Sequence, residues 1–186
     1  MTRIAMTTAA RAVHAPPFGG DLVRHYLRDL VYGANDGIIT TFAVVSGVAG
    51  ASLGSRTVLI LGVANLLADG FSMGASNFLS IRSEEAVRRS RGEGVGEPFP
   101  ARHAAATILA FGTAGIVPLL PYVAVPEPFR FRVALLATLL TLFGVGALRA
   151  TVVRIRWWAA GIEMLLVGAV AAGVSYGVGW LVAGLV

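Results

Sequence analysis

The chain has 186 residues, of which 56% are hydrophobic and only 13% are charged, and its formal net charge is +5. Soluble domains usually carry about 25% charged residues, so this composition excludes an ordinary soluble domain. The sequence has no cysteine, which excludes disulfides, thiolate metal sites and cysteine catalysis. All basic residues are arginines that lie between apolar runs, so we interpret them as topology signals and expect no nucleic-acid binding.

The N-terminal segment precedes the first apolar run. Residues 1–20 are small, polar and proline-containing, without the apolar stretch of a signal peptide, so we expect a disordered tail there. Residues 21–31, DLVRHYLRDLV, predict a short amphipathic helix that either lies on the membrane surface or runs straight into the first span.

Apolar runs follow along the rest of the chain, each about as long as the ~20 helical residues that cross a bilayer. The predicted fold is an all-α integral membrane protein, with one domain of about five transmembrane helices in residues 21–186. The expected spans are 33–54, 57–80, 103–125, 131–149 and 157–185.

The connections between spans predict the topology. Ser55 and Arg56 alone separate the first two spans, which predicts a tight hairpin, and the proline-rich segment 118–128 predicts a short, stiff connection after the third. Twelve of the fifteen arginines fall on the side of the N-terminus, which is therefore expected in the cytoplasm. With no organellar signal visible and a bacterial-looking composition, a prokaryotic plasma membrane is the expected location.

Three acidic residues fall inside the expected spans: Asp36, Asp69 and Glu163. A charged side chain at the centre of a membrane helix costs roughly 2.5–3.5 kcal/mol on insertion scales, so each is a candidate functional residue. Asp36 and Glu163 lie near cytoplasmic helix ends, where snorkelling or pairing with arginine is an alternative. Asp69 lies near the middle of its span, where that alternative fails.

The second span carries a polar stripe. Asn65, Asp69, Met73 and Asn77 recur every four residues and therefore lie on one helix face. They supply oxygen and sulfur donors, and the thioether favours softer first-row ions over Mg²⁺ or Ca²⁺. Ordinary core packing is the alternative for Met73. Because such a stripe is costly against lipid, it must face protein or a water-filled path.

The span limits place several of these residues at one depth. Asp36, Met73, Asn77 and Glu163 are expected to converge in the inner leaflet, with Asp69 deeper along the route. Five short spans enclose little polar volume, so we expect a homodimer with the path at or near its interface. Pairs spaced as GxxxG predict close helix approach, and they are Gly33 with Gly37, Gly70 with Gly74, and Gly173 with Gly177.

Two motifs carry a family resemblance. YGANDGIITTFAVVSGVAGA (32–51) followed by ANLLADGFSMGASNFLSIRSE (64–84) closely resembles the vacuolar iron transporter family, and residues 110–122 and 161–180 resemble its third and fifth spans. The resemblance implies a dimerising five-helix fold that moves Fe²⁺ or Mn²⁺ out of the cytosol in exchange for protons. It implies metal-path roles for Asp36 in the YGxxDG motif and for Met73 in the SMG motif, near the dimer axis.

The chain departs from that family in two places. Asn65 stands where plant and yeast-type members can carry glutamate, which leaves Asp69 to supply the carboxylate. The loop after the second span is short, where vacuolar members with a cytosolic metal-binding domain have a long glutamate-rich insertion. No such capture domain is expected here, and Glu84 and Glu85 are expected to pair with arginines one helical turn later.

The predicted function is therefore transport of Fe²⁺ or Mn²⁺ by proton antiport, for metal homeostasis and detoxification, with no permanently bound cofactor. A passive metal channel and a non-transporting membrane scaffold are the alternatives. An enzyme is not expected, because His14 lies in the tail, His25 and His103 lie near span boundaries, and no serine–histidine or histidine–metal arrangement is evident.

Overall fold

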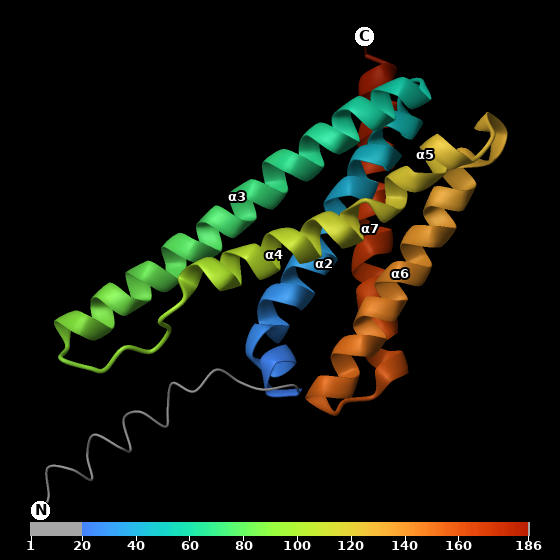
Figure 1. Cartoon of the computed structure of the whole chain (residues 1–186). Helices are drawn as coiled ribbons and strands as arrows, with labels where there is room; N and C mark the ends of the chain where they lie inside the picture. The colour runs from blue at the N-terminus through green and yellow to red at the C-terminus, as the bar shows by residue number, and fades with distance from the viewer. Residues whose placement is uncertain (1–19, 186) are drawn as a thin grey trace, which may run out of the picture.

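The computed structural model describes residues 20–185 of the chain, with side chains from Leu22 onward. The tail predicted for residues 1–20 therefore lies outside the described residues, apart from Gly20. Within this part of the chain the regular elements are helices and no strand occurs, which agrees with the predicted all-α class (Figure 1).

Five long helices and three short ones follow one another along residues 20–185. The long helices are α2 (Gly20–Gly50), α3 (Ser55–Ser90), α4 (Pro100–Gly115), α6 (Arg130–Val153) and α7 (Trp157–Ala183). The short elements join α4 to α6 and are the 3-10 helix η1 (Val117–Leu119), helix α5 (Leu120–Ala124) and the 3-10 helix η2 (Glu127–Phe129). Figure 1 shows α3 and α4 leaning together to one side of a group formed by α2, α6 and α7.

The chain is a multi-pass membrane protein. Four helical stretches of the described part are long and apolar enough to cross a membrane: Ser55–Ser90, Pro100–Ala124, Glu127–Val153 and Trp157–Ala183. They contain or closely match the second to fifth expected spans. The first expected span, 33–54, lies mostly in α2, which is not among the four because polar residues such as Asn35 and Asp36 lower its hydropathy.

Residues 21–31 run straight into the first span as one helix, which was one of the two predicted alternatives. Several helix ends differ from the expected span limits. Helix α2 ends at Gly50 rather than at residue 54, because the chain turns at Ser52 with a φ of +55°. Helix α3 continues ten residues past the expected limit, to Ser90. The third span is divided, since Pro118 has no backbone N–H and a 3-10 turn follows α4.

Helix α4 packs closely against both α2 and α3, and glycine makes this possible. A methyl group on Gly33 would lie 2.5 Å from the carbonyl oxygen of Thr107, and one on Gly37 would overlap the backbone of Phe111. Gly70 and Gly74 of α3 face α4 in the same way. The close helix approach predicted from these two GxxxG pairs therefore occurs within one chain. A methyl group on Gly173 or Gly177, by contrast, would meet no atom within 4 Å.

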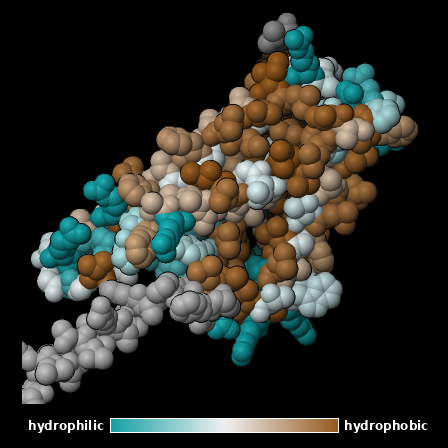
Figure 2. Space-filling view, viewed as in Figure 1, coloured by the Kyte–Doolittle hydropathy of each residue, from teal (hydrophilic) through white to brown (hydrophobic). Residues whose placement is uncertain are grey.

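Apolar and polar residues separate along the molecule. The main core cluster joins α2, α3, α5, α6 and η1, and it consists of Phe42, Val45, Val48, Val58, Leu119, Tyr122 and Ala134. On the face seen in Figure 2, hydrophobic residues cover the middle and hydrophilic ones gather toward the ends. The start of α2, the end of α3 and the start of α4, which carry many of the arginines, lie on the same side of the molecule (Figure 1).

Candidate functional site

A cleft of about 570 Å³ opens between α2, α3 and α4. Four of the six predicted site residues line it, namely Asp36 from α2 and Asp69, Met73 and Asn77 from α3. The remaining lining residues are Arg28, Asp29, Tyr32, Ser72, Ser76, Ser80 and Thr107. The cleft therefore combines three carboxylates, one thioether and several hydroxyl groups with a single guanidinium group.

Helical periodicity explains why these residues share the cleft. Asp29, Tyr32 and Asp36 are three and four residues apart, so they lie along one face of α2. Asp69, Met73 and Asn77 are each four residues apart and form the facing wall on α3, with serines between them. Asn65, the first residue of the predicted stripe, does not line the cleft, and its buried Nδ2 atom has no hydrogen-bond partner within the described part of the chain.

Asn77 ties the three helices together at one end of the cleft. Its Nδ2 atom donates to Oδ1 of Asp29 on α2 and to Oγ1 of Thr107 on α4, at 2.8 Å in each case. Asp29 and Thr107 are both buried. The Asn77 side chain therefore has a structural role as well as a place in the lining of the cleft.

Glu163 lies apart from the other predicted site residues. Its side chain is 63% exposed, and its Oε2 atom accepts a hydrogen bond of 2.8 Å from Arg149 of α6. It borders a different cavity of about 520 Å³ that Arg24, Arg28 and Asn35 also line. The expected convergence of Glu163 with Asp36 does not occur, and pairing with arginine describes it instead.

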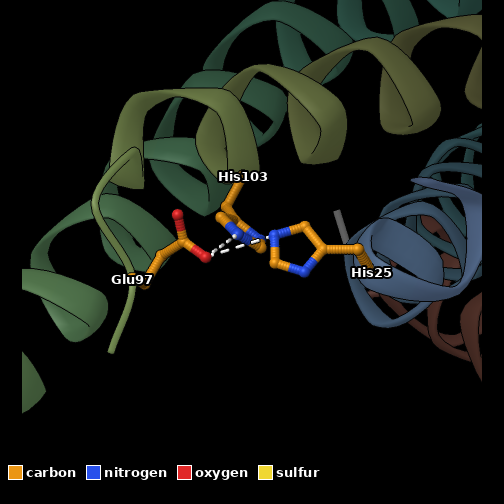
Figure 3. Close-up of side chains that lie close together, drawn as sticks. All are labelled: His25, Glu97 and His103. Carbon is orange, nitrogen blue, oxygen red and sulfur yellow. Dashed lines mark ion pairs between the residues drawn. The ribbon is translucent and has the colours of Figure 1, made fainter. Parts of the chain in front are cut away.

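A second polar cluster lies next to the cleft, and it contains two histidines from distant parts of the sequence. His25 of α2, His103 of α4 and Glu97 of the connection between α3 and α4 point toward one another (Figure 3). Oε2 of Glu97 lies 3.1 Å from Nε2 of His25 and 3.1 Å from Nε2 of His103. The sequence alone showed no histidine–metal arrangement, because these three residues are far apart along the chain and meet only in the fold.

The connection that carries Glu97 is held in place by hydrogen bonds. Glu85 accepts hydrogen bonds from the backbone N–H groups of Gly96 and Glu97, at 3.1 Å and 2.8 Å. The predicted pairing of Glu84 and Glu85 with arginines is not among the ion pairs of the described residues. Glu85 instead anchors the connection to the end of α3.

The electrostatic surroundings of Glu97 favour its ionised form. Burial acts to raise its pKa, but the backbone N–H of Phe99 and the neighbouring His103 and His25 outweigh burial and hold the pKa below its ordinary value. The carboxylate is therefore available as an acceptor, or as a ligand, at neutral pH.

Comparison with known proteins gives a consistent result. A sequence profile of the VIT family matches residues 27–94 and 91–180. The chain is 33% identical over 169 residues to vacuolar iron transporter homolog 5 of Oryza sativa subsp. japonica, covering 82% of this chain and 78% of that protein. It is 32% identical over 167 residues to vacuolar iron transporter homolog 3 of Arabidopsis thaliana, covering 82% and 80%. A shorter match of 60 residues, 45% identical, links it to the vacuolar iron transporter of Toxoplasma gondii, covering 32% of this chain and 20% of that protein.

Proposed function

This chain belongs to the VIT family, and from that premise we propose that it moves Fe²⁺ or Mn²⁺ out of the cytosol in exchange for protons. The observation that carries the proposal is the cleft in which Asp36, Asp69 and Met73 meet. The relatives are named as iron transporters, which supports a metal-ion cargo. Their names refer to the vacuole and give no support to the expected prokaryotic plasma membrane.

The cleft has the donor atoms that a first-row divalent ion requires. Carboxylate oxygens of Asp36 and Asp69 neutralise the charge of the ion, and the sulfur of Met73 favours Fe²⁺ or Mn²⁺ over Mg²⁺. Within the cleft three carboxylates face one guanidinium group, that of Arg28, so the field attracts cations.

Coupling to protons follows from the same residues. Burial favours the protonated form of a carboxyl group, whereas a bound cation favours the ionised form. A metal ion that enters the cleft therefore releases protons, and protons that enter from the other side displace the metal. This linkage supports exchange without a separate proton pathway.

We propose a five-span topology with a cytoplasmic N-terminus, in which α2 is the first span. Most arginines cluster near the start of α2, the end of α3, the start of α4 and the connection between α6 and α7. The cytoplasmic side of a membrane protein collects such charge. The cleft would then open toward the cytosol at Arg28 and Asp29, and Asp69 would lie farther into the membrane.

We also propose a homodimer that covers the cleft. The outer side of α3 has exposed Leu67 and Phe71 next to exposed Ser72 and Ser76. A polar cleft facing hydrocarbon is costly, and a second copy of α3 would separate it from lipid. Because the chain lacks cysteine, Ser76→Cys provides a single crosslinking probe. Crosslinking of Ser76→Cys, but not of the exposed α7 control Val178→Cys, is expected, and the reverse pattern would contradict this interface.

Metal flux into proteoliposomes tests the transport proposal. Wild-type protein should move Fe²⁺ and Mn²⁺ but not Mg²⁺, and an imposed pH gradient should change the rate. Asp36→Asn and Met73→Leu should each remove most of the flux. Flux that ignores the pH gradient would indicate the passive channel, and no flux from folded protein would indicate the scaffold.

A further inference from the structure

Three side chains at the proposed cytosolic end of the cleft have the spacing of metal ligands. One ligand atom each from His25, Glu97 and His103 lies within 4.8 Å of the others, and Oε2 of Glu97 is 3.1 Å from both histidine Nε2 atoms. Donor atoms bound ~2.1 Å from one ion lie ~3.0–3.4 Å apart in octahedral or tetrahedral geometry. The two 3.1 Å distances fit donors that share one cation, and without a cation they are ion-pair distances.

Asp29 orients His103 for this role. Nδ1 of His103 lies 2.5 Å from Oδ2 of Asp29, and both side chains are buried, at 11% and 7% exposure. The carboxylate accepts a hydrogen bond from the Nδ1–H group, which favours the tautomer with an unprotonated Nε2 atom. Asp29 is held in turn by Asn77 through its other oxygen. Metal-ligating histidines in proteins almost always have such a carboxylate or carbonyl partner.

The Nε2 atom of His103 is the next feature that supports a metal site. It is buried and has no hydrogen bond of good geometry to the residues that the structure describes, although it pairs with Oε2 of Glu97 at 3.1 Å. In the tautomer that Asp29 favours, both atoms are acceptors and no proton lies between them. A cation bound by both atoms satisfies them together, whereas a second proton on His103 would make the group an ion-pair network instead.

The cluster connects water with the cleft. His25 is 38% exposed, so the cluster is reached from outside. Its cavity of about 320 Å³ is lined by four carboxylates and two guanidinium groups together with the two histidines. Arg28, Asp29, Asn77 and Ser80 line both this cavity and the cleft, so the two spaces share a wall.

We propose that His25, Glu97 and His103 bind a divalent first-row transition-metal ion and load it into the cleft. Two imidazole ligands and one carboxylate suit Fe²⁺, Mn²⁺, Co²⁺ or Zn²⁺ and select against Ca²⁺ and Mg²⁺, which prefer all-oxygen ligands. The inference rests on the proposed transport function for the direction in which the ion moves, but binding itself is independent of transport.

Titration of detergent-solubilised full-length protein with Co²⁺ tests the binding. The visible spectrum of Co²⁺ reports nitrogen ligands, and the background variant Asp36→Asn/Met73→Leu removes two donors of the cleft. In that background we expect one Co²⁺ site, weakened at least about tenfold by Glu97→Gln or His25→Ala. Equal Co²⁺ affinity in the background and in Glu97→Gln would overturn the proposal and leave an ion-pair network.

Controls separate loss of a ligand from loss of the fold. Glu93→Gln removes an exposed carboxylate from the same connection, outside both cavities, and should leave Co²⁺ affinity unchanged. His25 is partly exposed, so His25→Ala should keep the helical circular dichroism and the gel-filtration volume of the wild type. Asp29→Asn should weaken Co²⁺ binding by about 10–100-fold without removing a ligand.

Flux measurements distinguish failure of this inference from failure of the transport proposal. If the site loads the cleft, His25→Ala raises the metal concentration for half-maximal flux while the maximal rate changes little. Wild-type protein that binds Co²⁺ at the cluster but transports no metal would overturn transport and retain the binding site. Normal transport with no histidine-dependent Co²⁺ spectrum would overturn the site and retain transport.

Discussion

Replacing Gly37 by alanine tests how closely α2 and α4 pack beside Asp36. The added methyl group would overlap the carbonyl oxygen of Phe111 and lie 2.9 Å from the carbonyl carbon and Cα of that residue. Carbon atoms in contact are normally ~3.5–4.0 Å apart. The obstructing atoms are backbone atoms, so no change of rotamer relieves the overlap. The two helices have to separate by roughly 1 Å, on the scale of that shortfall.

The expected magnitude combines two opposing effects. Overpacking of this kind costs ~1–3 kcal/mol, whereas alanine is favoured over glycine by ~1 kcal/mol inside a helix. Gly173→Ala in α7 is a matched control, because no atom lies within 4 Å of its added methyl group. Gly37→Ala should therefore be ~1–3 kcal/mol less stable than Gly173→Ala, even where its difference from wild type is small.

Unfolding in mixed micelles, followed by far-ultraviolet circular dichroism, measures the two stabilities. Metal flux into proteoliposomes provides a second readout, because separation of α2 from α4 also displaces Asp36, the residue next to Gly37. Flux should fall in Gly37→Ala and stay near the wild-type value in Gly173→Ala. Equal stability and equal flux for the two variants would refute the close packing of α2 against α4.

Three further predictions follow from individual contacts. Glu163→Gln should keep metal flux near wild type, since an exposed pair with Arg149 contributes only ~0–1 kcal/mol, and a collapse of flux would return Glu163 to the path. Asn77→Ala should lower the free energy of unfolding by ~1–3 kcal/mol, because the buried Asp29 and Thr107 lose their shared donor, and exposed Ser76→Ala is the neutral control for unfolding in micelles. In metal-free protein, ionised Glu97 stabilises the fold above its ordinary pKa of 4.5, and this contribution is lost as the pH falls through the lower pKa of the folded state. The stability difference between wild type and Glu97→Gln should therefore narrow below pH 4.5, and a difference that does not vary with pH would contradict it.

Much of the fold could be predicted because the bilayer imposes a helix length. The second to fifth spans correspond to observed helical stretches, since their apolar runs had to be about the length of a hydrocarbon core. Hydropathy gives no signal beyond the bilayer surface, and there the predicted end of the second span was wrong. Residues 81–90 are mostly polar or charged, yet they extend α3, because glutamate, alanine and arginine are good helix formers in water as well.

The cleft was partly predictable from periodicity and depth. The four-residue spacing of Asp69, Met73 and Asn77 placed them on one face of α3, and equal depth placed Asp36 beside them. Equal depth did not place Glu163 in the cleft, because its position around the axis of α7 directs the side chain toward Arg149 of α6. Spacing within one sequence segment contains no information on that rotation relative to another helix.

The histidine cluster could not be predicted from sequence spacing. His25 is separated from Glu97 and His103 by two spans of the sequence, and they meet because α4 packs against α2. Asp29 belongs to the segment 21–31 that the sequence predicts as an amphipathic helix, but its side chain is buried and bonds to Asn77 and His103. The available signal was the pair Gly33 and Gly37, which indicated close contact with some helix without indicating α4.

Because α2 is continuous, it fixes the distance between the histidine cluster and the cleft. His25 and Asp36 are eleven residues apart on one continuous helix, so they are separated by about 16 Å along its axis. An intact α-helix keeps its rise per residue, so the distance between His25 and Asp36 along the axis stays constant as long as α2 is intact. On the proposed route, an ion would cross this interval past Asp29 and Asn77, which line both cavities, while α2 keeps the two sites at a constant separation.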